Sequence, residues 1–520
     1  MDHLCLVEGR LLADDPGLGK TFMAGEMDRL LRVSDQGVKA GEWKPTLVVV
    51  PKNLRYTWGE WYARYRPHTR TIVIDTRSPK HREVFANAVK SRSHDVYICH
   101  YEGLKLLLGI LKDVEWLHFI LDEAHRISNR KTQTSKAVRV VKAAWRTALT
   151  GTAASKSPDQ LWAILNFLEP KVWTSYWAYR KRYVEERVDP IHGYRKAVGP
   201  NISMLPELQH RLKPMMVRRR KADVLPELPP KQYKNIWVDL SPKQRKIYDE
   251  MRTKMLTWVG EHEDEPLVAT VAIAQLIRLQ QIALATPAFV ERTRMVAQYW
   301  VELDDFGNEA PDEEGNPIYL RDRQGRRISE GLPKLEEQVV EIHLEEPSSK
   351  LDAVMEVVTD LVQQGQQVVI FSQFTRMIDL LCTRLESAGI AYGKYTGQTR
   401  DTTRTRIEQE FAERKISVFA GQFQAGGVGL NLQTASTVCF LDRAWTARDN
   451  LQAEDRIHRM GQLAETITVI DFLGRDTVDR GRFQQMLDGW HGVQLLLGDK
   501  NFDWTHMESL EEPEEEEILA

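Results

Sequence analysis

The chain has 520 residues, which is too many for one ordinary hydrophobic core and predicts roughly two to four domains. Hydrophobic residues make up 42% of the sequence, so a substantial interior is available, and no apolar run approaches the roughly eighteen residues of a membrane-spanning helix. The formal net charge is −3, which taken alone argues against a nucleic-acid partner.

The first candidate element is the segment LADDPGLGKT at residues 12–21. Its two glycines allow backbone amides to turn toward a phosphate, Lys20 supplies a cation and Thr21 supplies a hydroxyl for Mg²⁺. The usual pattern has a glycine where this chain has Asp14, so the match is partial and a plain glycine-bearing turn is the alternative. Residues 21–33 repeat apolar side chains on one helical face, which places the amino end of a helix beside the loop.

Short apolar, β-branched runs alternate with helical stretches in two parts of the chain. Near-continuous hydrophobicity in such runs predicts buried parallel strands. The runs are 46–50, 71–75, 95–99, 118–123 and 146–152 in the first part, and 367–373, 416–421, 437–442 and 467–473 in the second. The segment 376–388 predicts a helix that ends at Gly389. The sequence therefore predicts an α/β fold with two doubly wound parallel-sheet lobes.

The strand predicted at 118–123 ends in two adjacent carboxylates, Asp122 and Glu123. Neighbouring side chains on a strand diverge, so one carboxylate can hold Mg²⁺ while the other polarises an attacking water, as phosphoryl transfer requires. The alternative is a strand-end turn with solvated charges. The candidate phosphate loop upstream favours the catalytic interpretation.

Residues 158–349 change character. They begin with helical sequence in which Trp173 and Trp177 lie one turn apart, and we interpret both as core anchors rather than base-stacking platforms. Residues 302–336 are polar and turn-rich and predict an exposed insertion or a loose hairpin. The predicted domains are lobe 1 at 1–237 with a helical insertion at 158–230, a helical protrusion and polar linker at 238–349, and lobe 2 at 350–500.

The segment LQAEDRIHRMGQ at residues 451–462 predicts a helix that presents Gln452, Arg456 and Arg459 on one face before Gly461 ends it. Surface salt bridging is the ordinary explanation for an isolated arginine pair. If the two lobes face each other, however, ATP lies in the cleft and the arginines reach its γ-phosphate, a contact worth about 10³–10⁵ in rate. Closing the cleft would then couple hydrolysis to motion.

The last fourteen residues hold seven glutamates and no basic residue. Without them the net charge is −3 + 7 = +4, so the rest of the chain carries a small net positive charge. We expect residues 501–520 to form an acidic disordered tail, with a DNA-mimicking or self-inhibiting role as the alternative.

The four cysteines lie far apart and lack a C-x-x-C pair or a histidine at metal-ligand spacing. They are Cys5, Cys99, Cys382 and Cys439. Buried thiols in a reducing compartment fit best, so we expect no structural metal. The first segment lacks the charged-then-apolar pattern of a secretion signal, and we therefore expect a soluble cytoplasmic protein.

Six motifs occur in the order and spacing of helicase superfamily 2, and the chain resembles that superfamily over roughly residues 11–480. They are DDPGLGKT, DEAH, ALTGT, VVIFSQF, AGGVGLNLQTASTV and QAEDRIHRMGQ. The stretches 161–179, 212–231 and 431–445 resemble the Swi/Snf-type DNA-dependent ATPases in particular. Because the chain shows no appended chromatin-reading or zinc module, we expect a compact bacterial or phage form.

The resemblance implies two RecA-like lobes with helical protrusions that hydrolyse ATP with Mg²⁺ while gripping duplex DNA by its phosphate backbone. It implies nucleotide contacts from Asp14, Asp15, Pro16, Gly17, Leu18, Gly19, Lys20 and Thr21. It also implies metal binding by Thr21 and Asp122, and catalysis by Glu123, Gln452, Arg456 and Arg459. The implied DNA contacts, or relays between DNA and ATP, are Lys52, Thr150, Gly151, Thr152 and Gln373, with the loop 426–431.

Three features of the chain differ from the family pattern or are not explained by it. The family has an upstream segment whose glutamine reads adenine, and this chain begins too close to its phosphate loop to contain it. Either the amino end is truncated, or base recognition is looser. The sequence GTAASK at 151–156 replaces the usual Pro-Ile-Gln-Asn continuation, which puts the coupling of DNA binding to hydrolysis in doubt. The basic run VRRRKAD at 217–223 is interpreted as structural or phosphate-binding rather than as a targeting signal.

The leading hypothesis is a duplex-DNA translocase that remodels or displaces DNA-bound proteins, and the sequence is compatible with a monomer. The alternatives are a helicase that separates strands and an ATP-binding DNA scaffold with impaired hydrolysis.

Overall fold

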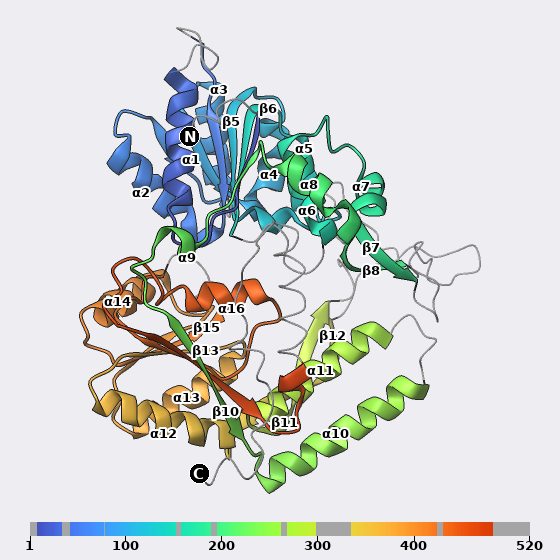
Figure 1. Cartoon of the computed structure of the whole chain (residues 1–520), viewed down its shortest axis with the longest axis vertical. Coiled ribbons are helices and arrows are strands. Elements are labelled where there is room, and N and C mark those ends of the chain that lie inside the picture. The colour runs from blue at the N-terminus through green and yellow to red at the C-terminus, as the bar shows by residue number, and fades with distance from the viewer. Residues whose placement is uncertain are drawn as a thin grey trace.

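The computed structural model describes residues 8–33, 42–76, 78–151, 158–188, 195–261, 268–297, 334–423 and 430–481. The chain forms two α/β lobes, with a helical insertion beside the first and a helical protrusion beside the second (Figure 1). Several predicted features lie outside the described residues, wholly or for the most part: Cys5, Thr152, the stretch 302–336, the loop 426–431 and the tail 501–520.

The sheet of the first lobe has the strand order β3-β4-β2-β5-β6-β1-β9, and its pairings are parallel. Its strands are β1 (Gly9–Leu12), β2 (Thr46–Val50), β3 (Thr71–Val73), β4 (Val96–His100), β5 (Trp116–Asp122), β6 (Ala143–Leu149) and β9 (Met216–Val217). The five apolar runs predicted in this half are confirmed as parallel strands. The sequence pattern missed β1 and β9 because four and two residues are too few to show a periodicity.

The register of three strands determines where the site can form. Asp122 at the end of β5 is paired with Leu149 at the end of β6, and Leu149 is paired with Leu12 at the end of β1. The segments that follow these strands therefore leave the sheet at the same edge, as the carboxyl ends of parallel strands do in doubly wound folds.

Helices cover both faces of this sheet. They are α1 (Lys20–Val33), α2 (Arg55–Tyr65), α3 (Pro79–Lys90), α4 (Tyr101–Leu111) and α5 (Gln133–Val140). On one face, Ala24 and Met27 of α1 share a core cluster with Trp58 and Trp61 of α2. Gly25 permits this close approach, because a Cβ at that position would overlap the indole ring of Trp61.

The insertion that follows lobe 1 contains more than helices. It comprises α6 (Leu161–Leu168), α7 (Tyr176–Tyr183), the antiparallel strands β7 (Val184–Val188) and β8 (Arg195–Pro200), and α8 (Leu205–Leu212). Trp173 is 5% exposed and serves as the predicted core anchor, but the same prediction for Trp177 is wrong because its side chain is 65% exposed. The two residues do not share a helical face, since α7 begins only at Tyr176.

The sheet of the second lobe has the strand order β10-β17-β16-β13-β15-β14, again with parallel pairings. Its strands are β10 (Lys231–Val238), β13 (Val368–Ser372), β14 (Tyr392–Tyr395), β15 (Val418–Gln422), β16 (Thr437–Phe440) and β17 (Ile467–Gly474). The four apolar runs predicted here are confirmed as strands. The predicted boundary at residue 237 needs correction, because β10 pairs along its whole length with β17 and so belongs to the second sheet.

Four helices of the second lobe are α12 (Ser349–Gln363), α13 (Thr375–Ser387), α14 (Asp401–Ala412) and α16 (Ala447–Glu454). The predicted helix at 376–388 corresponds to α13, and Gly389 follows it with a φ of +66°. Cys382 on this helix, Cys99 in lobe 1 and Cys439 in β16 are buried free thiols, as predicted.

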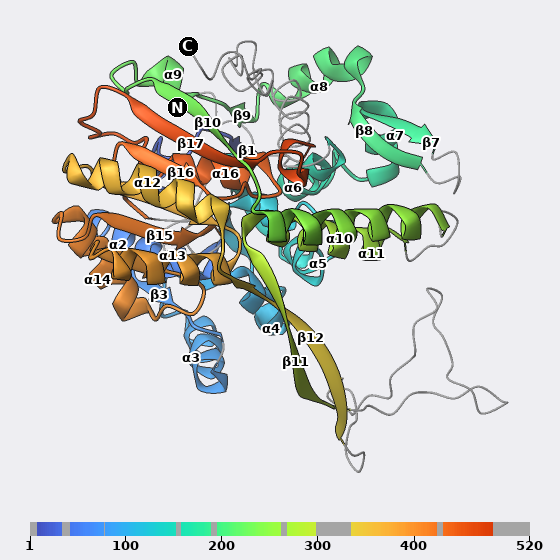
Figure 2. The same cartoon turned by 90° about the horizontal axis from the view of Figure 1, so that it is seen from below.

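A protrusion leaves the second lobe between β10 and α12. It consists of α10 (Pro242–Glu261), α11 (Val268–Leu284) and an antiparallel hairpin of β11 (Thr286–Ala297) and β12 (Lys334–Glu345). The hairpin extends away from both lobes in Figure 2 and flanks the polar stretch predicted to be exposed. Among the described residues, no helix combines the length and the apolar character that crossing a membrane requires.

Candidate active site

The loop between β1 and α1 has the backbone of a phosphate-binding loop. Gly17 and Gly19 have φ values of +90° and +77°, in the left-handed region that favours glycine. A Cβ at Gly19 would meet no atom within 4 Å, so the space beside this glycine is open. Helix α1 begins at Lys20, which places Lys20 and Thr21 at a helix amino end, where free N–H groups and the helix dipole favour an anion.

The side chain of Lys20 lies within this loop. Its Nζ donates hydrogen bonds to the backbone carbonyls of Asp14 at 2.7 Å and Asp15 at 3.1 Å. Burial lowers the pKa of Lys20, although the nearby carboxylates of Glu123 and Asp122 act in the opposite direction. The lysine therefore lies near the predicted metal ligand Asp122 and the predicted catalytic Glu123, where a phosphate would give it a charge-assisted partner in place of the carbonyls.

Asp122 is the last residue of β5 and has the surroundings of a metal ligand. Its Oδ1 accepts a hydrogen bond from the backbone N–H of Glu123 at 2.9 Å, and its Oδ2 accepts one from Nε1 of Trp58 at 2.8 Å. These two donors fix the orientation of the carboxylate. Burial and the neighbouring charge of Glu123 raise the pKa of Asp122 to about 6. A divalent cation would relieve both effects.

Glu123 adopts a left-handed backbone conformation, with φ 53° and ψ 52°, which is uncommon for a non-glycine residue and is typical of functional sites. Burial would raise the pKa of its carboxyl group, but the contact with His125 and the charges of Lys20 and Arg448 outweigh burial and lower it to about 2. Nδ1 of His125 lies 3.2 Å from Oε2 of Glu123. Glu123 is therefore held as a carboxylate that can accept a proton.

Helix α16 brings the second lobe to Glu123. Nε2 of Gln452 donates to Oε1 of Glu123 at 3.5 Å, so one hydrogen bond joins the two lobes at the predicted catalytic carboxylate. Arg448, on the first turn of the same helix, is near enough to lower the pKa of Glu123.

The predicted single helix carrying Gln452, Arg456 and Arg459 is wrong in its length. Helix α16 ends at Glu454, and the two arginines lie on the irregular turns that follow. Contacts from other segments take the carbonyls of these turns, because Leu432 N donates to Arg456 O at 3.0 Å and Lys221 Nζ donates to His458 O at 2.8 Å. The periodicity of a sequence gives no information about such contacts, because they come from distant segments of the chain.

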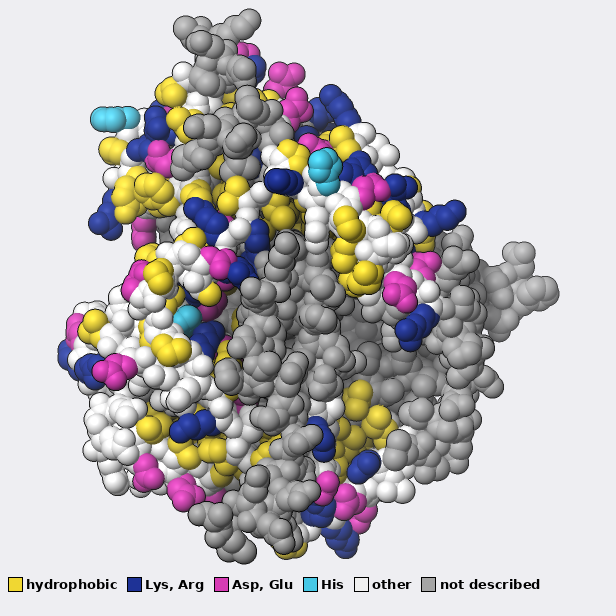
Figure 3. Space-filling model, in the orientation of Figure 1, with side chains coloured by type: hydrophobic (Ala, Val, Ile, Leu, Met, Phe, Trp, Pro, Cys, Tyr) yellow, Lys and Arg dark blue, Asp and Glu magenta, His cyan; other side chains and the backbone are white. Residues whose placement is uncertain are grey.

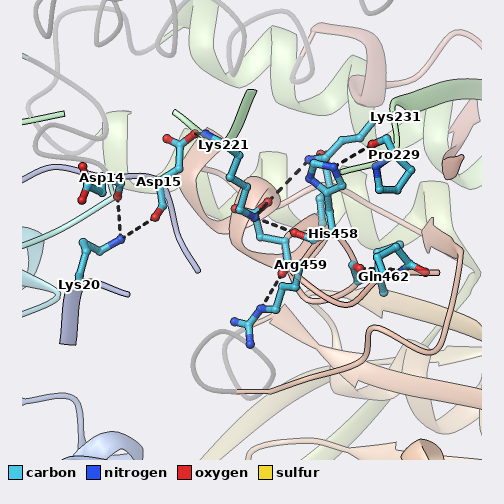
Figure 4. A network of polar contacts seen from close by, with 12 residues as sticks. Asp14, Asp15, Lys20, Lys221, Pro229, Lys231, His458, Arg459 and Gln462 are labelled. Atoms are coloured by element: carbon cyan, nitrogen blue, oxygen red, sulfur yellow. Dashed lines mark hydrogen bonds and ion pairs between the residues drawn. The ribbon is translucent and has the colours of Figure 1, made fainter. Parts of the chain in front are cut away.

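The two arginines nevertheless lie where an anion would be stabilised. Arg456 is 4% exposed, and burial together with the nearby charge of Arg459 lowers its pKa. The pKa of Arg456 also responds to Glu123, which places its guanidinium within electrostatic range of the first lobe. Nε of Arg459 donates to the carbonyl of Asp455 at 2.9 Å (Figure 4). A bound anion would offset the effect of burial on the charged form of Arg456.

The side chains of Asp14 and Asp15, predicted as nucleotide contacts, are directed elsewhere. The guanidinium of Arg219 forms an ion pair with Asp14, with an Nη2–Oδ2 distance of 2.5 Å, and that of Arg218 forms one with Asp15, with an Nη1–Oδ1 distance of 2.9 Å. Their backbone carbonyls, in contrast, accept the hydrogen bonds from Lys20. The two arginines belong to the basic run 217–223, which supports the structural interpretation of that run.

The loop residues fit a magnesium nucleotide. The open space beside Gly19, the amino end of α1, the Lys20 ammonium and the Asp122 carboxylate together match what a triphosphate and Mg²⁺ require. Thr21, partly buried on the first turn of α1, can offer its hydroxyl to the metal. Pro16 and Leu18 contribute backbone to the same loop.

Two of the described DNA-contact candidates, Lys52 and Asn431, are exposed. Lys52 lies in a short 3-10 helix (Lys52–Leu54) after β2. Thr150 is fully buried and donates its N–H to Leu12 O, and Gln373 is held inside lobe 2 by its Nε2 contact to Arg443 O at 2.6 Å. A Cβ at Gly151 would lie 3.1 Å from Cδ of Pro16. Thr150, Gly151 and Gln373 therefore fit a relay between sites better than direct phosphate contact.

The face seen in Figure 3 carries basic and acidic side chains interspersed over both lobes. Among the coloured residues of that face they do not gather into one broad basic patch. Backbone binding through a few cations, hydroxyls and amides is compatible with such a surface.

Sequence reasoning assigned no individual role at the site to three residues that the fold brings there: His125, Arg448 and Lys221, the last of which lies in the basic run 217–223. His125 is part of the DEAH motif, so its position beside Glu123 was the one signal available. Arg448 lies one helical turn before Gln452, but its direction depends on where α16 begins. Lys221 comes from a segment more than two hundred positions away from its partner Asp455, and no local pattern indicates that contact.

Residues 3–285 match the family described as the SNF2-related domain, and residues 349–461 match the helicase conserved C-terminal domain. Three relatives illustrate the similarity. The chain is 28% identical over 475 residues to the human "SWI/SNF-related matrix-associated actin-dependent regulator of chromatin subfamily A member 1", covering 90% of this chain and 40% of that protein. It is 28% identical over 462 residues to the "Transcription regulatory protein SNF2" of Saccharomyces cerevisiae, covering 88% and 24%. It is 24% identical over 496 residues to an "Uncharacterized ATP-dependent helicase" of Mycoplasma pneumoniae, covering 95% and 41%.

The chain thus spans less than half the length of each of these relatives. Among solved structures, it is similar to the Sulfolobus solfataricus SWI2/SNF2 ATPase core in complex with dsDNA, with 22% identity, a TM-score of 0.37, and coverage of 94% of this chain and 93% of that one. The SNF2-related match alone extends over more than half of the 520 residues. Together with the two α/β lobes and the phosphate loop, it shows that this chain belongs to the SNF2-related family of helicase superfamily 2.

Proposed function

We propose that this chain hydrolyses ATP, that duplex DNA stimulates the hydrolysis, and that the two lobes convert it into movement along DNA that remodels or displaces bound proteins. The observation that carries the proposal is the 3.5 Å contact between Gln452 of the second lobe and Glu123 of the first. A site shared between two lobes links a chemical step to their relative motion. We further propose that the protein acts in the cytoplasm of a bacterium or a phage-infected cell.

In the proposed reaction, the first lobe binds and orients the substrate. Lys20 and the amino end of α1 would hold the β- and γ-phosphates, and Thr21 and Asp122 would hold Mg²⁺, which neutralises phosphate charge. Glu123, kept ionised by its cationic surroundings, would accept a proton from the attacking water. Trp58 keeps Asp122 in place through its hydrogen bond to Oδ2.

The second lobe would complete the site. Arg456 and Arg459 would stabilise the negative charge that develops on the transferred phosphoryl group, and Gln452 would orient Glu123 and the water beside it. Because these groups come from the lobe opposite the phosphate loop, a change in lobe position would change the rate of hydrolysis.

Steady-state phosphate release, measured with duplex DNA, with single-stranded DNA and without DNA, tests the proposal. We expect duplex DNA to stimulate release and Glu123→Gln to abolish it while nucleotide binding persists. Glu102→Gln is the matched control, because that carboxylate is 59% exposed and forms a surface pair with Arg126. Equal rates with and without DNA would refute the motor, and release of single strands from the duplex would favour the strand-separating helicase instead.

A further inference from the structure

One segment of the chain is an edge of both sheets. Strand β9 pairs with β1 in the first lobe, and the backbone N–H groups of residues 11, 13 and 15 donate to the carbonyls of residues 215, 217 and 219. The same segment then enters β10, which pairs with β17 in the second lobe. Residues 215–238 therefore pair first with β1, the strand that leads into the phosphate loop, and then with β17 in the sheet of the second lobe.

Lys221 lies between these two pairings and contacts both lobes (Figure 4). Its backbone N–H donates to Oδ2 of Asp15 at 3.0 Å. Its side chain passes the phosphate loop, since Cε of Lys221 lies 3.6 Å from the position that a Cβ on Gly17 would occupy. Its Nζ then donates to Oδ1 of Asp455 at 2.7 Å and to the carbonyl of His458 at 2.8 Å.

The contact with Asp455 is buried, with the two side chains 7% and 9% exposed. Asp455 directly precedes Arg456 and His458 directly precedes Arg459, so Lys221 binds the turns that carry both arginines. A buried ion pair holds its partners in defined positions, and breaking one partner is costly.

A second set of contacts anchors these turns within the second lobe. Arg443 binds Asp471 through Nε and Nη2 at 2.5 and 2.6 Å, and it binds Oε1 of Glu454 through Nη1 at 2.8 Å. Nζ of Lys231 contacts Oε2 of the same Glu454 at 2.8 Å. These contacts fix the end of α16 to the core of lobe 2. Lys221 then connects this end of the helix, through Asp455, to the phosphate loop.

We propose that Lys221 is a positioning residue that sets the arginine turns in register with the phosphate loop, so that nucleotide held beside Gly17 aligns Arg456 and Arg459 with the transferred phosphate. The inference rests on the proposed ATP hydrolysis. Misplacing a catalytic group by about 1 Å can reduce a rate by about 10²-fold, so a residue that only orients can control turnover.

The test uses the full chain with Lys221→Met, which keeps the length of the side chain and removes its charge. Lys231 remains 3.9 Å from Asp455, so this acid keeps a cationic neighbour in the variant. We expect kcat to fall by about 10- to 100-fold, while the Kd for a fluorescent ADP changes by less than about threefold. Affinity for ADP with aluminium fluoride, which mimics the transferred phosphoryl group, should fall by about the same factor as kcat.

Two comparisons separate positioning from general stability. Lys350→Met removes an equally buried ion pair, Lys350–Asp479, that lies wholly within the second lobe, and it should lower the melting temperature without changing the ratio of aluminium fluoride to ADP affinity. Asp455→Asn should reduce kcat as Lys221→Met does, and combining the two should cause no further loss. If Lys221→Met does not fold, Lys221→Gln, which retains a hydrogen-bond donor, carries the same expectation.

The results distinguish a failure of the proposed hydrolysis from a failure of the positioning role. A parent protein that releases no phosphate would refute the proposed function. An active parent whose Lys221 variants keep kcat within about threefold, or lose ADP and aluminium fluoride affinity equally, would overturn the positioning role and leave the proposed hydrolysis intact.

Discussion

The contact between β1 and α6 allows a stability prediction with a calculable sign. Gly9 opens β1, and a Cβ at this position would lie 2.5 Å from the carbonyl oxygen of Leu168 and 2.8 Å from its carbonyl carbon. Both atoms belong to the backbone at the end of α6, which cannot rotate away as a side chain can. Gly9→Ala therefore forces the helix and the strand apart.

Forcing an extra methyl group into a packed interior typically costs about 1–3 kcal/mol. For a lobe of this size, each kcal/mol lowers the melting temperature by about 2–4 °C. We expect Gly9→Ala to lower the first melting transition by about 2–12 °C, measured by differential scanning calorimetry.

Gly109→Ala is the matched control. Gly109 lies in α4, is exposed, and a Cβ there would meet no atom within 4 Å. Alanine in an exposed helix is about 0.5–1 kcal/mol more favourable than glycine, so this variant should melt slightly higher than the parent. The same substitution should thus have opposite signs at the two positions. Gly9→Ala melting within about 1 °C of the parent would show that the backbone of α6 can move away from β1 at little cost.

Three further predictions concern the site and its surroundings. Arg456→Ala should reduce kcat by about 10³-fold or more with little change in ADP affinity, measured by phosphate release and fluorescent ADP binding; an equal loss of both would contradict a role confined to the transferred phosphate. Burial lowers the pKa of His118, which faces Asp28 and Arg32 of α1 and Arg10 of β1; the stability it contributes is present above its unfolded pKa of about 6.5 and is lost as the pH falls below that value. The melting temperature should therefore fall less between about pH 7.5 and 5.5 in His118→Gln than in the parent, and parallel curves would argue against it. Lys52→Ala should weaken duplex binding and reduce the slope of log affinity against log salt by about 1, leaving DNA-free hydrolysis unchanged; an unaltered slope would remove Lys52 from the interface.

Local patterns predicted the elements that depend on local residues. Nine apolar runs became parallel strands, and Lys20, Asp122 and Glu123 meet at one sheet edge because parallel strands bring their carboxyl ends together. The errors arise where distant contacts decide. Helix α16 ends early because Leu432 and Lys221 bind the carbonyls beyond it, although its sequence remains periodic to residue 459.

The directions of side chains were less predictable than the positions of elements. Asp14 lies in the phosphate-loop segment and was predicted to contact the nucleotide, yet its carboxylate binds Arg219, a residue about two hundred positions away. Trp177 has the hydrophobicity of a core residue, but its environment includes the guanidinium groups of Arg130 and Arg180 at 5.4 and 5.8 Å from its ring. Aromatic rings pair with cations as well as with apolar neighbours, and composition does not distinguish the two uses.

The membership of β10 in the second sheet affects how the protein can be divided for study. A fragment that starts at residue 349, where the helicase C-terminal match begins, would lack the strand that covers β17. Eight consecutive backbone positions of β17 would then face solvent along an apolar edge, which invites association between copies. A C-terminal fragment should remain soluble and unaggregated only if it begins before Lys231, because it then includes β10, the strand that pairs with β17 at the edge of the sheet.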